Sequence, residues 1–514
     1  MSGSRAALPR TRLTSARPFV KTRTMLRRYT IVVLVCVVAV AARCWKIDAP
    51  FTDRWSWRQS DVAAIARNYF ENGFHFARPQ IDWAGDQPGF VGTEFPVLPF
   101  AAAIIYRFFG VQEWIGRLQT ILVFALSLPF LFAIVRRAFD EPTAIYALVF
   151  YSFAPLSIAA GRAFMPDILA LALALAGFYF FWRGVTAAGR GKPDDSAAGS
   201  DDYNLLVASF LIGFSLLIKP SMATIAAPMA AVVWRKFGTG MFRLPSLWLV
   251  ALIALFPSVV WYWHAHRIVQ QFYPHHFFGA GGVRIMSLSW YGHIALQTCT
   301  STLTPILLAI ALLGIFVSRN NPSAAPFRWW LAAMIIFIIV VGYGNRHQWY
   351  QLPLVPIAAT FGGVALRFTE KKWNQGVVIT LLILFLAFSF FYSRQFFTPA
   401  AQSLWQLGRE LHARTPVNAL VIAADDGDPT AFYYAHRKGW HFLERDGIYD
   451  GNPRDSAQII SDLEELRSRG ATHLVFCSGT TWWLDYYEEF ADYLARNSTL
   501  ESATADYRIY KLAR

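Results

Sequence analysis

Charged residues are scarce in this sequence. Only 16% of its 514 residues are Asp, Glu, Lys or Arg, whereas 55% are hydrophobic. Soluble domains carry about 25% charged residues. The shortage excludes an ordinary soluble protein and predicts a polytopic α-helical membrane protein.

Cysteine and sequence repeats are scarce as well. The four cysteines, Cys36, Cys44, Cys299 and Cys477, have no metal-ligand spacing and dictate no disulfide pair. The sequence contains neither an internal repeat nor a glycine-rich phosphate-binding motif. Cysteine spacing and glycine patterns therefore point to no particular function.

Acidic residues are missing from residues 1–28, which hold several arginines and a lysine. The first apolar run, from Tyr29 to about Ala42, is followed by no small-residue cleavage site. This pattern predicts an uncleaved anchor with residues 1–28 in the cytoplasm. The net charge of +14 does not indicate nucleic-acid binding, because the basic residues lie mainly between apolar runs, where they set orientation.

Apolar runs recur along the chain as far as residue 393. We predict about eleven transmembrane helices in a domain of residues 29–393, with a first periplasmic loop at residues 46–113. The predicted spans are residues 29–42, 114–135, 141–160, 166–182, 203–218, 221–236, 246–263, 294–316, 327–343, 351–367 and 375–393.

The positive-inside rule selects one topology. Residues 95–110 are apolar, but the run is short and contains two prolines and an arginine. If this run lies in the outer interface without crossing, every later basic cluster falls in the cytoplasm. We therefore predict an interfacial segment there and a C-terminus outside.

Helix and strand patterns alternate through residues 394–514, which predicts a periplasmic α/β domain. The expected helices are residues 403–414, 429–437, 456–469 and 482–496, and the expected strands are residues 419–424, 440–443, 473–477 and 508–512. The run Asp425-Asp426-Gly427-Asp428 resembles part of a calcium loop but lacks the spacing and the final Glu. We interpret it as a solvated turn.

The stretch from Trp55 to Phe70 combines aromatic, apolar and charged residues at helical spacing. Such a helix can lie at the membrane surface with its apolar side down and its charges up. It is either an amphipathic helix that only anchors the loop or an active-site helix in which Asp61 acts as a base.

Ionisable residues collect at the outer ends of the predicted spans, where they are costly unless paired or functional. We expect several to line one cavity near the outer headgroups. Its cations would bind a lipid phosphate, and a carboxylate would accept a proton from a hydroxyl nucleophile. The main candidates are Arg162 and Asp167 beside Pro166, Lys219 before Pro220, and the run His347-Gln348-Trp349-Tyr350-Gln351-Leu352-Pro353.

Several motifs on the predicted outer side follow one another in a particular order. They are Arg58-Gln59-Ser60-Asp61, Thr93-Glu94-Phe95-Pro96, Arg117, Gly161-Arg162-Ala163-Phe164-Met165-Pro166-Asp167, Leu217-Ile218-Lys219-Pro220 and Trp349-Tyr350-Gln351-Leu352-Pro353. Their order resembles that of the GT-C glycosyltransferases that use polyprenyl-phosphate sugars, such as the protein O-mannosyltransferases and the lipid A aminoarabinose transferase. The resemblance covers most of the chain.

The resemblance implies an inverting glycosyltransferase of the bacterial inner membrane. It would move a sugar from a polyprenyl phosphate to a lipid, glycan or protein acceptor at the periplasmic face. By that resemblance Asp61 is the catalytic base, Glu94 and Asp167 hold the acceptor or the sugar, and Arg162, Lys219 and Tyr350 bind the lipid phosphate. The full set of expected substrate-binding residues is Arg58, Glu94, Arg117, Arg162, Asp167, Lys219, His347 and Tyr350.

The sequence departs from the family pattern at the position of the catalytic base. Relatives often carry an adjacent Asp-Glu pair where this chain reads Gln59-Ser60-Asp61, so the upstream Asp53 is the alternative base. Some relatives place a divalent metal near the acceptor site. His275 and His276 could correspond to it, but we assign no metal ligand.

Two other functions stay open at this point. One is a ligase or polymerase of surface polysaccharide with a polyprenyl-diphosphate donor. The other is a transporter or flippase of a lipid-linked sugar, although transporters typically show repeated halves and charges at the bilayer midplane. The sequence names neither the sugar nor the acceptor.

Overall fold

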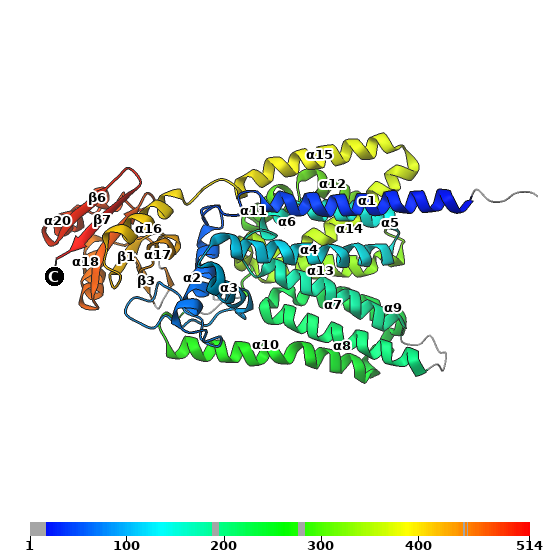
Figure 1. Cartoon of the computed structure of the whole chain (residues 1–514), viewed down its shortest axis with the longest axis horizontal. Helices are drawn as coiled ribbons and strands as arrows, with labels where there is room; N and C mark the ends of the chain where they lie inside the picture. Colours follow the sequence, from blue (N-terminus) through cyan, green and yellow to red (C-terminus); the bar gives the residue numbers. More distant parts are fainter. Residues whose placement is uncertain (1–16, 188–194, 276–282, 446–447, 450, 514) are drawn as a thin grey trace, which may run out of the picture.

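A computed structural model describes residues 17–187, 195–275, 283–445, 448–449 and 451–513. Figure 1 shows a bundle of long helices and, at one end of it, a small domain that contains a β-sheet. Helices α2 (Ser56–Asn72) and α3 (Val97–Phe109) lie at the end of the bundle nearest this domain. This end is where the predicted site residues are expected.

The bundle consists of helices whose sequences are mostly apolar. They are α1 (Arg17–Cys44), α4 (Glu113–Ala138), α5 (Glu141–Phe153), α6 (Pro155–Ala160), α7 (Asp167–Ala187), α8 (Asp195–Ile218), α9 (Ala226–Phe237), α10 (Pro245–Gln271), α11 (Leu288–Gln297), α12 (Pro305–Val317), α13 (Ala325–Val340), α14 (Leu354–Lys372) and α15 (Gln375–Ser393). Among the described residues, five helices are long and apolar enough to cross a membrane, or six if α11 and α12 form one bent span. The several apolar helices agree with a polytopic membrane protein, and the count of about eleven stays a prediction.

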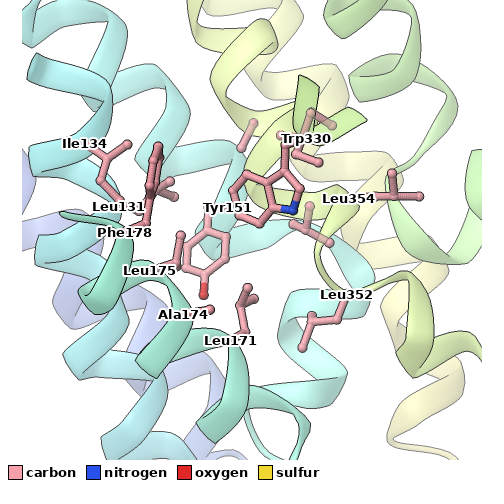
Figure 2. Close-up of a cluster of buried hydrophobic side chains, with 14 of the residues drawn as sticks. Leu131, Ile134, Tyr151, Leu171, Ala174, Leu175, Phe178, Trp330, Leu352 and Leu354 are labelled. Atoms are coloured by element: carbon pink, nitrogen blue, oxygen red, sulfur yellow. The ribbon is translucent and has the colours of Figure 1, made fainter. Parts of the chain in front are cut away.

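A continuous apolar core holds the bundle helices together. Figure 2 shows part of it, where Leu131 of α4, Leu175 and Phe178 of α7 and Trp330 of α13 cluster with Tyr151 of α5. Each of these side chains is at most 2% exposed. In a bilayer such packing depends on van der Waals contact and not on the exclusion of water, so a close fit between helices matters.

The predicted continuous span at residues 294–316 is broken in the structure. Helices α11 and α12 are bent by 102° relative to each other. A π-helical turn, η3 (Thr298–Thr302), follows α11, and α12 begins at Pro305 with Thr304 as its cap, whose hydroxyl accepts a hydrogen bond from the Leu307 N–H at 3.1 Å. Hydropathy did not reveal the break, because both helices are apolar.

Basic residues gather at the end of the bundle away from the C-terminal domain. Arg28 of α1 lies 3.7 Å from Glu141, and Arg367 of α14 lies 3.1 Å from Asp140. Lys236 of α9 donates to a carbonyl of α7 at 2.5 Å. Each of these basic residues thus contacts a neighbouring helix or the residue that caps it.

The C-terminal domain is an α/β domain, as predicted. Its five-stranded sheet has the order β2-β1-β5-β7-β6, in which β2, β1 and β5 are parallel and β7 is antiparallel to its neighbours β5 and β6. The strands are β1 (Leu420–Ala424), β2 (Lys438–His441), β5 (Ala471–Cys477), β6 (Ser498–Ala503) and β7 (Tyr507–Leu512), and a separate hairpin pairs β3 (Glu444–Arg445) with β4 (Ile448–Tyr449). The helices are α16 (Gln402–Arg414), α17 (Thr430–Ala435), α18 (Ser456–Ser468), α19 (Trp483–Tyr486) and α20 (Glu488–Asn497). Strand β6 was not predicted, because it is an edge strand with no buried residue and so shows no hydrophobic alternation.

The run at residues 425–428 is solvated only in part, because Asp426 is exposed whereas Asp425 is buried. Asp425 is 2% exposed, and its Oδ1 lies 2.7 Å from His441 Nδ1. Asp428 accepts a hydrogen bond from the Ser56 hydroxyl of α2 at 3.1 Å. Burial raises the pKa of Asp425. The interpretation as a solvated turn missed these contacts because nothing in the local sequence indicates that α2 and His441 reach the turn.

The contact between α12 and α14 supports a stability prediction. A Cβ added at Gly314 of α12 would lie 1.9 Å from the Phe361 carbonyl oxygen of α14. The helix propensity gained by Gly→Ala is about 1 kcal/mol, but a clash with backbone costs about 1–3 kcal/mol or more. We expect Gly314→Ala to lower the Tm of the detergent-solubilised protein. Gly240→Ala is the control, because a Cβ there meets nothing within 4 Å; equal Tm values for the two variants would contradict the packing.

Candidate active site

Helix α2 carries Asp61 and is enclosed on most sides. Its buried residues include the run from Val62 to Tyr69, and Arg67 is only 2% exposed. The helix packs against α3 on one side and α17 of the C-terminal domain on another. The C-terminal domain thus covers part of α2, and the position of the helix at the membrane surface stays a prediction.

A chain of ion pairs starts at Asp61. Arg58, one turn earlier, donates from Nη1 to Asp61 Oδ2 at 3.1 Å and from Nη2 to the two carboxylate oxygens of Glu94 at 2.7 and 2.6 Å. Lys219 Nζ lies 2.9 Å from Glu94 Oε1 and 3.3 Å from Asp167 Oδ1. The structure thus brings together five of the predicted site residues, with one more carboxylate than cations.

Proline positions several members of this chain. Pro220 disfavours helical backbone at the preceding residue. Lys219 accordingly leaves α8 with extended angles, φ −144° and ψ 103°. Asp167 follows Pro166 as the first residue of α7, and Glu94 lies two residues before Pro96, the N-cap of α3. Helix ends therefore deliver these side chains to one place.

Burial makes these pairings strong. Burial by itself opposes ionisation of Glu94, but the cations of Arg58 and Lys219 outweigh it and hold the pKa of this carboxyl well below its usual range. Burial likewise opposes the charge of Arg58, yet Glu94 and Asp61 outweigh it and raise the pKa of this guanidinium. The ion pairs therefore favour the charged forms of both Glu94 and Arg58.

Aromatic rings lie beside the ion-pair chain. Lys219 Nζ lies 5.4 Å from the ring centroid of Tyr350, within the range of a cation–π contact. His347 stacks on Trp349 with ring centroids 4.6 Å apart and planes at 4°, and Trp57 of α2 lies 5.5 Å from His347. Tyr350 and His347 are thus close to the predicted site, as expected.

Arg117 and Arg162 belong to a neighbouring group around Asp53. Their guanidinium nitrogens lie 3.9 and 3.8 Å from Asp53 Oδ2. Both also donate to main-chain carbonyls of the segment after α1: Arg117 to those of residues 47, 49 and 50, and Arg162 to those of residues 45 and 46. Gln59 of α2 donates to Asp53 at 2.9 Å. These contacts hold the start of the first loop in place.

Trp83 was missed by the sequence analysis. Its indole Nε1 donates to Asp61 Oδ1 at 3.3 Å, so it contacts the proposed base directly. It lies in the polar stretch between α2 and α3 as one of 19 tryptophans, and no local signal separates it from the others. Only a contact between segments distant in sequence identifies it.

The described residues do not fit a resident metal ion. No group of three or more His, Cys, Asp or Glu side chains among them could hold one. His275 Nδ1 lies 2.9 Å from the Val269 carbonyl oxygen, and His276 lies outside the described residues. The suggested correspondence to a metal site near the acceptor therefore gains no support from this part of the chain.

Comparison with known protein families gives a match to part of the chain. Residues 86–263 match the family model of dolichyl-phosphate-mannose-protein mannosyltransferases. A comparison with curated proteins gave no match.

Solved structures share the fold over nearly the whole chain. ArnT from Cupriavidus metallidurans in the apo state has a TM-score of 0.64 at 14% identity, over 96% of this chain and 98% of that one. The same protein bound to undecaprenyl phosphate has a TM-score of 0.61 at 15% identity, over 93% and 97%. The archaeal oligosaccharyltransferase AglB from Archaeoglobus fulgidus, in complex with an inhibitory peptide and a dolichol-phosphate, has a TM-score of 0.59 at 11% identity, over 94% and 74%. The resemblance to the GT-C superfamily is confirmed.

The environment of His347 supports a pH prediction. Burial, together with Arg346, Arg58 and Lys219, lowers its pKa to about 3. The unfolded chain binds a proton near pH 6.5, so His347 supports stability above that pH, and this support is lost as the pH falls towards 3. We expect wild-type stability to fall by about 1 kcal/mol per pH unit from pH 6 to 4 through this residue alone.

A matched pair of variants isolates this contribution. His347→Gln should show a flatter dependence of Tm on pH between 6 and 4 than the wild type. His293→Gln, on the exposed face of α11, should follow the wild-type curve. If the curves of Tm against pH for His347→Gln and the wild type run parallel, the lowered pKa assigned to His347 is refuted.

Proposed function

Because this chain has the GT-C fold and its charged residues meet at one end of the bundle, we propose that it is a glycosyltransferase. It moves a sugar from a polyprenyl-phosphate donor to an acceptor hydroxyl or amine, with inversion at the anomeric carbon. ArnT from Cupriavidus metallidurans, which shares the fold, has been crystallised with undecaprenyl phosphate. That lipid is of the class we propose as the donor's carrier.

One observation carries this proposal. The carboxylate of Asp61 is joined through Arg58 and Glu94 to the ammonium of Lys219 by contacts of 2.6–3.1 Å. A base for the acceptor and a cation for the leaving phosphate are therefore part of one connected group. Sugar transfer needs the base and the phosphate-binding cation close enough together to contact the two ends of one sugar phosphate.

The reaction balances with these groups. The acceptor oxygen or nitrogen attacks the anomeric carbon and forms the new glycosidic bond, while the bond from that carbon to the phosphate oxygen breaks. Asp61 takes the acceptor proton as general base. Its side chain is 13% exposed, which leaves it accessible to an acceptor. The bond electrons leave on the polyprenyl phosphate.

Lys219 is the proposed partner of the leaving phosphate. An ammonium carries three donors. Its contacts with Glu94 and Asp167 use two, and we assign the third to a phosphate oxygen. This cation stabilises the charge that grows as the bond breaks, and Tyr350 lies beside it.

Glu94 and Asp167 orient Lys219 and face the sugar or the acceptor in this proposal. For Arg162 and Arg117 we infer a main role other than the expected binding of substrate. Their contacts with Asp53 and with the main chain of residues 45–50 favour a role in holding the first loop. Any contact they make with the phosphate is secondary to that role.

We place the site at the periplasmic face of a bacterial inner membrane. The clustering of basic residues at the opposite end of the bundle supports this orientation through the positive-inside rule. The C-terminal domain is then periplasmic. The polyprenyl-diphosphate and transporter alternatives gain no observation in their favour.

The decisive variant is Asp61→Asn, which keeps the shape of the side chain but removes the base. We expect loss of sugar transfer by about 10²–10⁴-fold, with wild-type insertion in the membrane and a protein that stays folded. Mass spectrometry of cell-envelope glycans, with the gene absent and then restored as wild type or variant, reports the product.

Asp53→Asn tests the alternative base. Asp53 is bound by two arginines and Gln59, so its loss should lower the Tm and leave measurable transfer. Full transfer by Asp61→Asn, or its complete loss in a stable Asp53→Asn protein, would assign the base to Asp53.

Lys219→Met tests the phosphate site. We expect at least a tenfold loss of affinity for undecaprenyl phosphate, because a charge-assisted contact is worth about 1.5–3 kcal/mol. Lys236→Met at the opposite end of the bundle is the control. Binding can be followed as the lipid-dependent rise in Tm; an unchanged rise in Lys219→Met would argue against this site.

A further inference from the structure

Trp83 connects the proposed base to the C-terminal domain. The residue is 9% exposed and donates from Nε1 to Asp61 Oδ1 at 3.3 Å. Arg58 donates to the other carboxylate oxygen, Oδ2, at 3.1 Å. Two donors from different segments therefore determine how the Asp61 carboxylate is oriented.

The turn that carries Trp83 is hydrogen-bonded to the edge of the sheet of the C-terminal domain. The Gly85 N–H donates to the Gly439 carbonyl at 2.7 Å, and the Gly439 N–H donates to the Asp82 carbonyl at 3.1 Å. Gly439 belongs to β2, the edge strand of the sheet. An edge strand offers unpaired N–H and C=O groups for such an addition. The backbone on both sides of Trp83 is thereby attached to the C-terminal domain.

This junction has no spare room. A Cβ at Gly85, where φ is +57°, would lie 1.8 Å from a ring atom of Trp440, and a Cβ at Gly439 would lie 1.8 Å from the Val421 carbonyl oxygen. Only glycine fits at these two positions. The close fit at Gly85 and Gly439 therefore fixes where the segment that carries Trp83 lies against β2.

The indole of Trp83 also rests on a side chain of the domain. Its ring centroid lies 5.2 Å from that of His441, the last residue of β2. His441 Nδ1 in turn lies 2.7 Å from the buried Asp425, which directly follows β1. The carboxyl ends of two parallel strands thus support the face of Trp83.

Helix α2 is fastened to the same junction. Asp82 Oδ2 accepts from Arg67 Nη2 at 2.5 Å, and its Oδ1 accepts from Asn68 at 3.0 Å. Arg67 also donates to the Tyr433 carbonyl of α17 at 2.6 Å. The helix that carries Asp61 and the segment that carries Trp83 are therefore held against one another by the C-terminal domain.

We propose that Trp83 is a positioning residue for Asp61 and that the C-terminal domain completes the active site by holding Trp83 in place. The indole N–H keeps the carboxylate turned towards the acceptor, and β2 with His441 keeps the indole there. This inference rests on the proposed function of Asp61. It gives the domain a role in catalysis beyond that of a cover.

A double-mutant cycle tests the contact without any activity measurement. The full-length protein in detergent is compared as wild type, Trp83→Phe, Asp61→Ala and the double variant. We expect the Tm loss of the double variant to be smaller than the sum of the single losses, because the two side chains interact directly. Additive losses would overturn the inference.

The kcat of Trp83→Phe distinguishes a positioning role of Trp83 from a role in packing alone. In liposomes supplied with polyprenyl-phosphate sugars and acceptor lipids extracted from the producing cells, Trp83→Phe should lower kcat about tenfold, as expected for one hydrogen bond to a charged group. The KM for the donor and the Tm rise with undecaprenyl phosphate should stay at wild-type values, because Lys219 is unchanged. Wild-type kcat would overturn the inference while the proposed function stands. Wild-type turnover by Asp61→Asn would remove Asp61 as the base and, with it, this inference, whereas loss of turnover in that variant with wild-type kcat in Trp83→Phe would overturn the inference alone.

A glycine pair tests the part played by the domain. Gly85→Ala should reproduce the loss of kcat seen with Trp83→Phe, because the methyl group separates the segment from β2. Gly292→Ala in α11, where a Cβ meets nothing within 4 Å, should have wild-type kcat. Wild-type kcat in Gly85→Ala would show that the domain does not hold Trp83. If Gly85→Ala fails to accumulate, the kcat of Trp83→Phe and the double-mutant cycle of Trp83 and Asp61 decide whether the inference stands.

Discussion

The guanidinium of Arg58 bonds to the carboxylates of both Asp61 and Glu94, and the arrangement of the site follows from this contact. Buried charges are costly unless they are paired and hydrogen-bonded. Four segments supply the five charged residues of the ion-pair chain: α2 supplies Arg58 and Asp61, and the others come from the residues before α3, the residue after α8 and the start of α7. The pairing is complete only when all these segments are in place, so correct assembly of the bundle and formation of the site are one event.

A buried ion-pair chain is weak evidence for stability. Desolvation of the charges can exceed the attraction between them, and well-packed apolar side chains often stabilise as much. The case for function therefore rests on position. The ion-pair chain lies at the end of the bundle where α2 meets the C-terminal domain (Figure 1). Asp61 is partly accessible there. The group around Asp53 is similar in composition, but its arginines are committed to main-chain carbonyls, which favours a structural role.

The two domains depend on one another through α2. One side of this helix belongs to a cluster of buried side chains that includes Phe51, Leu98 and Tyr433, and its polar residues reach Asp428 and Thr430. The C-terminal domain is thus attached along the helix that carries the proposed base. A comparable attachment through Trp83 brings the domain to the base itself.

Much of this protein could be predicted from its sequence by local properties. Apolar runs indicated the membrane helices, basic residues between them indicated a common side, and alternating patterns indicated the α/β domain. The order of short motifs then pointed to Asp61, Arg58, Glu94, Asp167 and Lys219, which the structure joins. Other features depended on contacts between distant segments and had no local signal. They are the bend between α11 and α12, the edge strand β6, the burial of α2 and of Asp425, the pairing of Arg117 and Arg162 with Asp53, and the contact of Trp83 with Asp61. Hydropathy and propensity describe what each segment prefers on its own, whereas pairing of buried polar groups is decided only when the folded chain brings their partners together.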